Sequence, residues 1–215
     1  MKSYVVVGMG RFGTEAAKQL FSLGCEVLAI DNGSDVIQQI ANDVTHAVVA
    51  DARDKEVLRS LGVADFDCAI VAIGDSLTDS VLATMNLLEL GVPHLVCKAY
   101  DETHSQILKK LGAHQVLIPE KEQAARLARS LSNPNVLDYI ELSNDHGIIE
   151  VPAPKTWRGK TLKDLNVRAK LGVNIIAVRQ GEQINVSPVA DYCVGAADVL
   201  VVLGDAIALE KVQKL

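Results

Sequence analysis

The feature that most constrains this chain is a glycine-rich turn inside the sequence VVVGMGRFGTEAAKQL of residues 5–20. Residues 5–7 are β-branched valines, which favour a buried strand, and the alanine-rich residues 14–20 favour a helix. The turn between them consists of Gly8, Met9, Gly10, Arg11, Phe12 and Gly13. A G-x-G-x-x-G spacing permits a tight turn and lets a phosphate approach the helix N-terminus, and the alternative is an ordinary glycine-rich strand-to-helix turn.

An acidic residue stands where a dinucleotide-binding unit needs one. The second apolar run, EVLAID, ends at Asp31, which is 23 residues after Gly8. Folds of this type place an acid about 20 residues after the turn, where it binds ribose hydroxyls. An acid at a strand end is also a common N-cap of the following helix, so two roles stay open for Asp31.

The rest of the first half alternates between apolar runs and helical runs. Strands are predicted at 45–52, 68–74, 94–99 and 115–120, and helices at 54–62, 79–91 and 102–112. This alternation predicts an α/β fold with a Rossmann-like, doubly wound parallel sheet, whose ligand lies beyond the carboxyl ends of the strands. This places Asp31, Asp51, Gly74, Lys98 and Glu120 beside the opening turn, and the further candidate cofactor-binding residues are Asn32, Ala52, Ala72 and Ile73.

Composition favours aliphatic cores and argues against several classes of partner. Of the 215 residues, 49% are hydrophobic and 4% aromatic, which favours cores of Val, Ile, Leu and Ala in one large or two modest domains. The net charge of −6 argues against binding to nucleic acid and against adsorption to anionic lipid. Because no run approaches 18 apolar residues and no signal-peptide pattern is present, we expect a cytoplasmic protein.

The cysteines and histidines form no metal or disulfide pattern. Cys25, Cys68, Cys97 and Cys193 are scattered without a C-x-x-C pair. The strand positions 68 and 97 favour buried, small hydrophobic side chains. His46, His94 and His114 stand just before predicted strands, where a surface or loop role is expected.

A different pattern follows the sixth predicted strand. An amphipathic helix is predicted at 120–131, ended by SNPN, and a second apolar helix or turn at 136–142. Short strands are predicted at 148–153, 174–180, 182–188 and 198–205, with helices at 161–172 and 206–215. This α+β pattern with antiparallel hairpins, one of them with Gly181 at its tip, predicts two domains, 1–133 and 134–215. Arg168 is either a phosphate ligand or a surface arginine on a helix.

Several segments together resemble one family. The segments are GMGRFG, an acid after the second strand, VVADA, IVAIG, CKA, LGAHQVLIPEKE, LNVRAK and ADVLVVLGD. This combination, and GRFG with IPEK in particular, resembles the RCK (KTN) family that regulates potassium conductance, and more narrowly the cytosolic regulatory subunits of bacterial Ktr potassium-uptake systems. The resemblance covers nearly the whole chain and implies a nucleotide-binding RCK domain followed by a smaller regulatory C-terminal domain.

The resemblance implies an adenine nucleotide in the first domain: ATP or ADP in the Ktr branch, NAD(H) in the Trk branch. It assigns the phosphate turn to Gly8, Gly10 and Gly13, the ribose to Asp31, the adenine to Asp51 and Ala52, and the γ-phosphate to Arg11. Lys98 would stand near the phosphates or ribose, and Glu120 would help to bind Mg²⁺ or another divalent cation at a subunit interface. A helix-capping role for Glu120 remains open.

One position departs from the family pattern. Members often continue Asp-Ala-Thr after the third strand, and this chain has Asp51, Ala52 and Arg53. If the Arg53 side chain turned toward the ligand, it would favour a ligand with extra negative charge. If it turned to solvent, it would have no such effect.

The resemblance also implies partners. Family subunits form dimers through the first domain and assemble as an octameric ring against a membrane-embedded potassium transporter, so this chain would lie at the inner face of the cell membrane. In some members the C-terminal domain binds cyclic di-AMP, and NVRAK, NIIAV and SPVAD lie where such contacts would fall.

Two enzyme classes compete with this interpretation. A dehydrogenase would use the same turn, but it needs a proton-transfer residue that the second domain does not provide in recognisable form. An ATPase of the P-loop type would need the spacing G-x-x-x-x-G-K-[ST], which is absent. A regulator that binds a nucleotide without turnover therefore explains the sequence best.

Overall fold

The computed structural model describes residues 1–132, 138–143 and 145–215. The chain forms two compact units, Met1–Lys121 and Glu122–Leu215. The boundary that the sequence predicts, between residues 133 and 134, lies outside the described residues. Among the described residues, no helix is long and apolar enough to cross a membrane.

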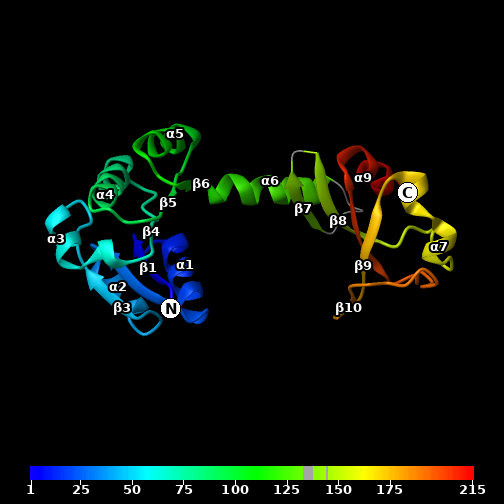
Figure 1. Ribbon diagram of the computed structural model, residues 1–215, viewed down its shortest axis with the longest axis horizontal. Coiled ribbons are helices and arrows are strands. Elements are labelled where there is room, and N and C mark those ends of the chain that lie inside the picture. The colour runs from blue at the N-terminus through cyan, green and yellow to red at the C-terminus, as the bar shows by residue number, and fades with distance from the viewer. Residues whose placement is uncertain (133–137, 144) are drawn as a thin grey trace. The chain divides into compact units, whose positions relative to one another are not determined.

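The first unit contains a parallel sheet in the order β3-β2-β1-β4-β5-β6 (Figure 1). Its strands are β1 (Ser3–Val7), β2 (Glu26–Asp31), β3 (His46–Val49), β4 (Cys68–Val71), β5 (Leu95–Lys98) and β6 (Gln115–Leu117). Its helices are α1 (Arg11–Ser22), α2 (Ser34–Ile40), α3 (Lys55–Ser60), the 3-10 turn η1 (Val63–Asp65), α4 (Leu77–Glu89) and α5 (Glu102–Leu111). The predicted doubly wound sheet is confirmed, and its strand order reverses between β1 and β4, where such folds bind ligands.

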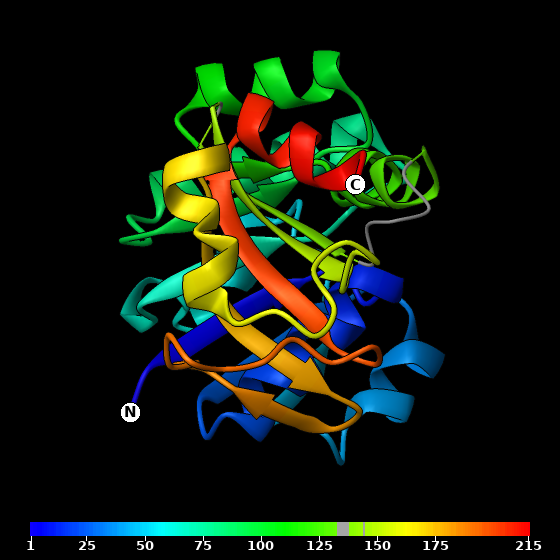
Figure 2. The ribbon, with the colours of Figure 1, turned by 90° about the vertical axis from the view of Figure 1, so that its right-hand side faces the viewer.

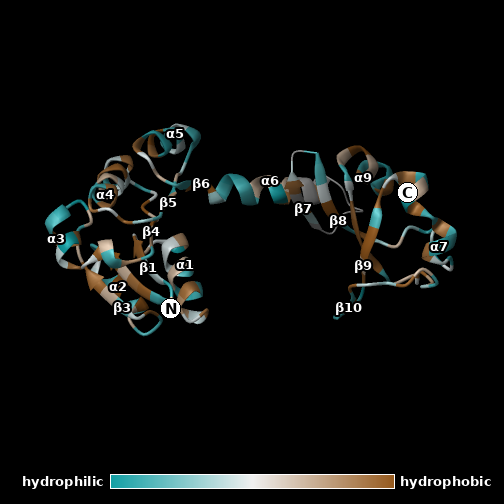
Figure 3. Ribbon diagram, viewed as in Figure 1, coloured by the Kyte–Doolittle hydropathy of each residue, from teal (hydrophilic) through white to brown (hydrophobic). Residues whose placement is uncertain are grey.

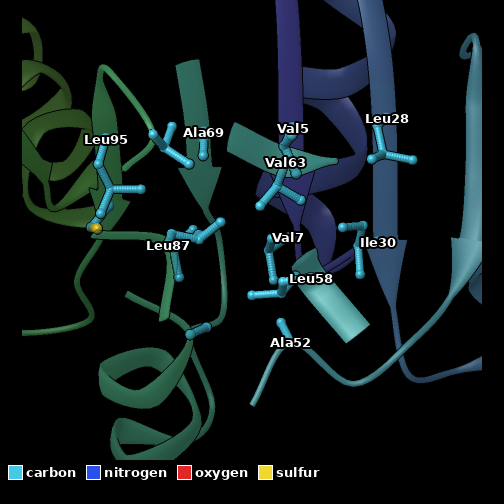
Figure 4. Close-up of a cluster of buried hydrophobic side chains, with 14 of the residues drawn as sticks. Val5, Val7, Leu28, Ile30, Ala52, Leu58, Val63, Ala69, Leu87 and Leu95 are labelled. Atoms are coloured by element: carbon cyan, nitrogen blue, oxygen red, sulfur yellow. The ribbon is translucent and has the colours of Figure 1, made fainter. Parts of the chain in front are cut away.

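Helices cover both faces of this sheet. Successive side chains of a strand point to opposite faces, so the apolar side chains of the sheet contribute to two cores. One core holds buried side chains of β1, β2, β4 and β5 with those of α3, α4 and α5, and Figure 4 shows Val5, Val7 and Ile30 in it beside Leu58 and Leu87. The opposite core joins residues of β1 and β2 to α1 and α2; it contains Val6, Ala17, Ala29, Ile37 and Ile40. Each fully buried Leu, Ile or Val contributes about 1.5–3 kcal/mol, so the carboxyl ends of the strands sit on a rigid base.

The second unit contains an antiparallel sheet in the order β10-β9-β11-β8-β7. Its strands are β7 (Asp138–Ser143), β8 (His146–Pro152), β9 (Asn174–Gln180), β10 (Gln183–Asn185) and β11 (Val199–Asp205). The helices α7 (Leu162–Leu165), α8 (Val167–Leu171) and α9 (Ala206–Gln213) accompany this sheet, and Figure 2 shows α9 in red alongside β11. Ile149, Leu200, Val202 and Leu209 form the centre of its core.

Helix α6 (Pro119–Ser132) begins in the first unit and continues past Lys121. Residues 121–128 are all exposed, and Figure 3 shows this helix mainly in the hydrophilic colour. This helix confirms the amphipathic helix predicted at 120–131. Of the segment SNPN, which was predicted to end the helix, only Ser132 is among the described residues, and it is the last residue of α6.

Three details differ from the sequence predictions. Where a helix or turn was expected at 136–142, the described residues 138–143 form strand β7, because pairing with β8 overrides the helical propensity of this segment. The helix expected at 161–172 is two short helices, since Asn166 adopts a left-handed conformation with φ of 44° between them. Helix α2 was not predicted. The hairpin at Gly181 is confirmed, with φ of 58° at the tip between β9 and β10.

Candidate functional site

A cavity of about 650 Å³ lies at the carboxyl ends of the strands in the first unit. The predicted site residues that line it are Gly8, Met9, Gly10, Arg11, Phe12, Asp31, Asn32, Asp51, Ala52, Ala72, Ile73, Gly74, Lys98 and Glu120. Gly13 belongs to the turn but does not line the cavity. Further residues that were not predicted also line the cavity, among them Val36, Asp75, Asp79 and Tyr100.

The glycine turn has the geometry that its spacing predicts. Gly8 has φ of 94°, a left-handed conformation that other residues rarely adopt. A Cβ on Gly13 would lie 1.9 Å from the carbonyl oxygen of Gly8, so α1 packs against the turn only because residue 13 has no side chain. Gly10 is the N-cap of α1, and a Cβ on it would have no neighbour within 4 Å. The turn therefore leaves open space next to the helix N-terminus.

The first turn of α1 is a suitable anion site. No side chain caps the N-terminus of this helix, and the residue before Arg11 is a glycine. The N–H groups of a helix N-terminus carry partial positive charge and bind phosphate oxygens. Arg11 is exposed at the same end of the helix and adds a guanidinium, which pairs with phosphate through two parallel hydrogen bonds.

Asp31 connects the turn to the end of β2. Its Oδ2 accepts a hydrogen bond from the backbone N–H of Met9 at 2.6 Å, and its Oδ1 accepts one from Gly33 at 2.8 Å. Because a carboxylate has about four acceptor positions, this arrangement leaves an acceptor position on each oxygen for a ribose hydroxyl. The N-cap of α2 is Gly33, so Asp31 is not itself the capping residue of that helix.

Lys98 and Glu120 form an ion pair at the other end of the cavity. Lys98 Nζ lies 2.8 Å from Glu120 Oε1 and 5.9 Å from the centre of the Phe12 ring. The hydrogen bond from Lys98 is the main cause that lowers the pKa of Glu120. Glu120 lies within the first turn of α6, which begins at Pro119, and its exposed side chain points a carboxylate toward the cavity. Both charges are therefore beside the position expected for the phosphates.

Arg53 lines the cavity and is bound by two carboxylates. Its Nε lies 2.9 Å from Asp51 Oδ1 and 3.0 Å from Oδ2, and its Nη2 lies 2.7 Å from Asp51 Oδ2. Its Nη1 lies 3.2 Å from Asp79 Oδ1. These hydrogen bonds lower the pKa of Asp51 and raise that of Arg53. Arg53 therefore lines the cavity with its guanidinium paired to Asp51 and Asp79, and its effect on a ligand stays a prediction.

Tyr100 is an aromatic lining residue whose position depends on buried groups. Its backbone N–H donates to His104 Nδ1 at 3.5 Å, and the two rings lie 4.8 Å apart. His104 is fully buried, with Nε2 3.1 Å from Ser80 Oγ, and burial lowers its pKa. An imidazole that accepts at Nδ1 carries its proton on Nε2, so His104 is neutral and holds the Tyr100 backbone in place.

The remaining candidates take structural or surface positions. Cys68 and Cys97 are buried as predicted, and burial raises the pKa of Cys97 to about 11. The predicted surface positions of His46, His94 and His114 are confirmed, with His114 Nδ1 accepting the N–H of Leu95 at 3.0 Å. Arg168 is exposed on α8. In the described ranges, no three His, Cys, Asp or Glu side chains are grouped so that they could hold a metal ion.

Comparison with known proteins places this geometry in a family. The TrkA-N domain model matches residues 4–119 and the TrkA-C domain model matches residues 147–215. The Ktr system potassium uptake protein C of Bacillus subtilis (strain 168) is 40% identical over 213 residues, which are 99% of this chain and 96% of that protein. The Ktr system potassium uptake protein A of the same organism is 40% identical over 203 residues, which are 94% of this chain and 91% of that protein.

A solved structure agrees with the fold. The RCK domain of GsuK superposes with a TM-score of 0.68 at 20% identity, covering 100% of this chain and 47% of that one. This chain thus spans about half the length of the GsuK RCK chain, and the likeness shows a shared fold. Taken with the two domain matches, these relatives show that the chain belongs to the TrkA-N and TrkA-C domain family of the Ktr potassium uptake proteins.

Proposed function

We propose that the chain is a cytoplasmic regulatory subunit that binds an adenine nucleotide in the first unit and thereby controls a membrane-embedded potassium transporter. The observation that carries the proposal is the cavity, where an uncapped helix N-terminus, Arg11 and the carboxylate of Asp31 face one space. A phosphate fits the first two groups and a ribose fits the third. The family's potassium uptake proteins supply the transport context.

The nucleotide lies along the carboxyl edge of the sheet in this proposal. Its adenine lies beside Asp51 and Ala52, its ribose binds Asp31, and its first phosphates bind the turn from Gly8 to Gly13. Arg11 binds the γ-phosphate of ATP, and Lys98 binds phosphate or ribose oxygens. ATP and ADP then make different contacts at the Arg11 end. A two-state regulator responds differently to ATP and ADP if these contacts differ between its two conformations.

A divalent cation belongs to the same proposal. Glu120 and the ATP phosphates supply hard oxygen ligands, which suit Mg²⁺. A carboxylate facing a triphosphate is repelled unless a cation lies between them, and such a cation would compete with Lys98 for Glu120. The cation therefore favours the triphosphate over the diphosphate.

In this proposal, residues 1–133 bind the nucleotide, and residues 134–215 form a regulatory domain that takes cyclic di-AMP as a second effector. Copies of the chain form dimers and then an octameric ring at the inner face of the membrane. The exposed apolar side chains of Ile184, Val186 and Val189 in the second unit favour association with another surface.

An NAD(H)-dependent oxidoreductase, or an NAD-responsive regulator, is the second candidate. Tyr100 favours it, because a phenol that lines the cavity is a group able to move a proton. Incubation with NADH and a panel of carbonyl compounds distinguishes an oxidoreductase from a regulator, since an enzyme oxidises NADH and a regulator only binds it.

Isothermal titration of the purified chain with ATP, ADP, NAD and NADH tests the proposal. We expect one adenine nucleotide per chain, with ATP affinity increased by Mg²⁺. Absence of binding by all four nucleotides would contradict the proposal. Turnover of NADH by the chain would show that it is an NAD(H)-dependent oxidoreductase instead.

A further inference from the structure

Residues 155–170 of the second unit, here called the basic segment, carry positive charge in a chain whose overall charge is negative. The basic segment contains six Lys or Arg residues and one acidic residue, which gives it a formal charge of +5, whereas the whole chain has −6. All six cationic residues are exposed; they are Lys155, Arg158, Lys160, Lys163, Arg168 and Lys170. The net charge of the chain therefore hides a local surplus of positive charge, and such a surplus attracts an anionic partner.

The cations of the basic segment are not neutralised by carboxylates of the same chain. Among the described residues, none of the six forms an ion pair. Asp164, the acid within the segment, accepts a hydrogen bond from Thr161 Oγ1 at 2.7 Å. Two of the cations donate to backbone carbonyl oxygens: Arg158 Nε to Ala153 at 3.1 Å, and Lys170 Nζ to Asp164 at 3.4 Å. The positive charge of the segment is therefore available to a partner.

The basic segment is a folded surface and adjoins an exposed apolar side chain. It contains α7 and α8, and the N–H groups of Leu162 and Lys163 donate to the carbonyl oxygens of Tyr192 at 3.0 Å and Ala190 at 2.8 Å. Val189, the residue before Ala190, is 68% exposed. Protein surfaces that lie on a bilayer combine cations, which bind anionic headgroups, with exposed apolar side chains. The segment and the loop beside it have this combination.

Nucleic acid fits the basic segment less well than lipid does. Proteins bind single strands with exposed aromatic side chains, on which the bases stack. The aromatic residue of the segment is Trp157, which is 6% exposed and belongs to the core of the second unit. The major groove of a duplex is read by an α-helix or a β-ribbon, but α7 and α8 have only four and five residues. The segment therefore offers charge without the means to read or stack bases.

We propose that the basic segment is a docking surface for anionic membrane lipid. The inference rests on the proposed location of the chain at the inner face of the membrane. The cytoplasmic leaflet has a negative surface potential, which attracts clusters of about four to eight Lys or Arg residues. The six cations bind lipid phosphates at the bilayer surface, so the second unit contacts the membrane directly in addition to the transporter. The expectation from net charge, that the chain does not adsorb to anionic lipid, does not hold for this segment.

Sedimentation of the full chain with lipid vesicles tests the inference. Vesicles that contain phosphatidylglycerol and phosphatidylcholine are compared with vesicles of phosphatidylcholine alone, at roughly 0.15 M salt. We expect binding to the anionic vesicles only, and its loss at roughly 1 M salt, because salt screens the attraction between exposed charges and lipid. The assay contains no nucleotide and no transporter. Its failure would leave the proposed nucleotide binding intact, and a failure of nucleotide binding in titration would leave the vesicle result intact.

The triple variant Lys155→Gln/Lys160→Gln/Lys163→Gln removes half of the cations at exposed positions. Each Lys or Arg near an anionic bilayer contributes roughly fivefold in affinity, so this variant should bind the anionic vesicles at least about tenfold more weakly. The fluorescence of Trp157, the single tryptophan of the chain, shows whether the second unit of the variant remains folded. If it does not, the single variant Lys163→Gln and the salt series on the wild-type chain replace the triple variant.

The matched control is Lys109→Gln/Lys110→Gln/Lys211→Gln, which removes three exposed charges outside the basic segment and should change vesicle affinity by less than about threefold. The inference is overturned if the wild-type chain binds neither kind of vesicle or binds both equally. It is also overturned if the triple variant of the segment binds like the wild-type chain, or if the control loses as much affinity. Tighter binding to a DNA duplex than to anionic vesicles would assign the segment to nucleic acid instead.

Discussion

The substitution Asp31→Asn tests the nucleotide site with the smallest change in shape. In the native chain the two carboxylate oxygens accept the N–H groups of Met9 and Gly33 at 2.6 and 2.8 Å. An amide has one acceptor oxygen and one NH₂ donor, so one of these N–H groups would face another donor. The variant therefore loses a charge-assisted hydrogen bond to the turn and also offers ribose hydroxyls a weaker acceptor.

The expected loss of nucleotide affinity in Asp31→Asn follows from these contacts. Loss of one hydrogen bond to a charged group costs about 1.5–3 kcal/mol, which corresponds to roughly a ten- to hundredfold loss of affinity. Because ATP, ADP and NADH share the adenosine ribose, all three should weaken by a similar factor.

Isothermal titration of the three nucleotides measures the effect. The matched control is Asp35→Asn, which makes the same substitution at an exposed position in the first turn of α2, outside the cavity. We expect wild-type affinities for the control. Unchanged affinities in Asp31→Asn would refute the ribose assignment and leave Asp31 as a residue that only shapes the turn.

Three further predictions concern the phosphate end and the second unit. Arg11→Ala should weaken ATP more than ADP in titration, because only ATP has a γ-phosphate, and equal losses would place Arg11 on shared phosphates. Glu120→Gln should abolish the increase in ATP affinity caused by Mg²⁺ and leave ADP unaffected, and a persisting Mg²⁺ effect would exclude Glu120 as a cation ligand. Asp198→Asn should lower the free energy of unfolding of the second unit by about 1–3 kcal/mol, since one of the donors from Gln180, Tyr192 and Gly195 would face an amide NH₂. Urea unfolding followed by the fluorescence of the single, buried tryptophan measures this change, and an unchanged unfolding midpoint would contradict it.

Asp198 also gives the second unit a defined response to acid. Burial alone would raise the pKa of this carboxyl, but hydrogen bonds from Gln180, Gly195 and Tyr192 outweigh burial and leave the pKa below its ordinary value of 3.8. A lowered pKa in the folded chain means that the stabilisation is present above pH 3.8 and is lost as the pH falls through the lowered value.

Much of the first unit could be predicted because its signals are local. The valines at 5–7 mark a buried strand, and the glycines at 8 and 13 permit a turn in which the positive φ of Gly8 and the close packing at Gly13 exclude side chains. Once alternating strands and helices predict a parallel sheet, all strand ends fall on one edge. Many of the residues that line the cavity could therefore be named from the sequence, although Val36, Asp75, Asp79 and Tyr100 were not among them.

Other features depend on contacts between distant segments. Asp79 meets Arg53 from a helix 26 positions further along the chain, and a single sequence does not show such a pairing. Its place in a helical first turn signals only a favourable interaction with the helix N-terminus. Tyr100 likewise gains its position from His104 and Ser80, which are buried by tertiary packing. Strand β7 forms because β8 supplies a partner, which overrides local propensity.

Potassium flux tests the central claim most directly. The chain would be reconstituted with the membrane-embedded potassium transporter subunit of the same organism in vesicles, and flux would be measured with ATP, with ADP and without nucleotide, each with Mg²⁺. A nucleotide-sensing regulator predicts that flux differs between ATP and ADP, and that Asp31→Asn shifts the response to higher nucleotide concentrations. Equal flux under all three conditions, with the subunit bound to the transporter, would contradict the claim that nucleotide binding to this chain controls potassium transport.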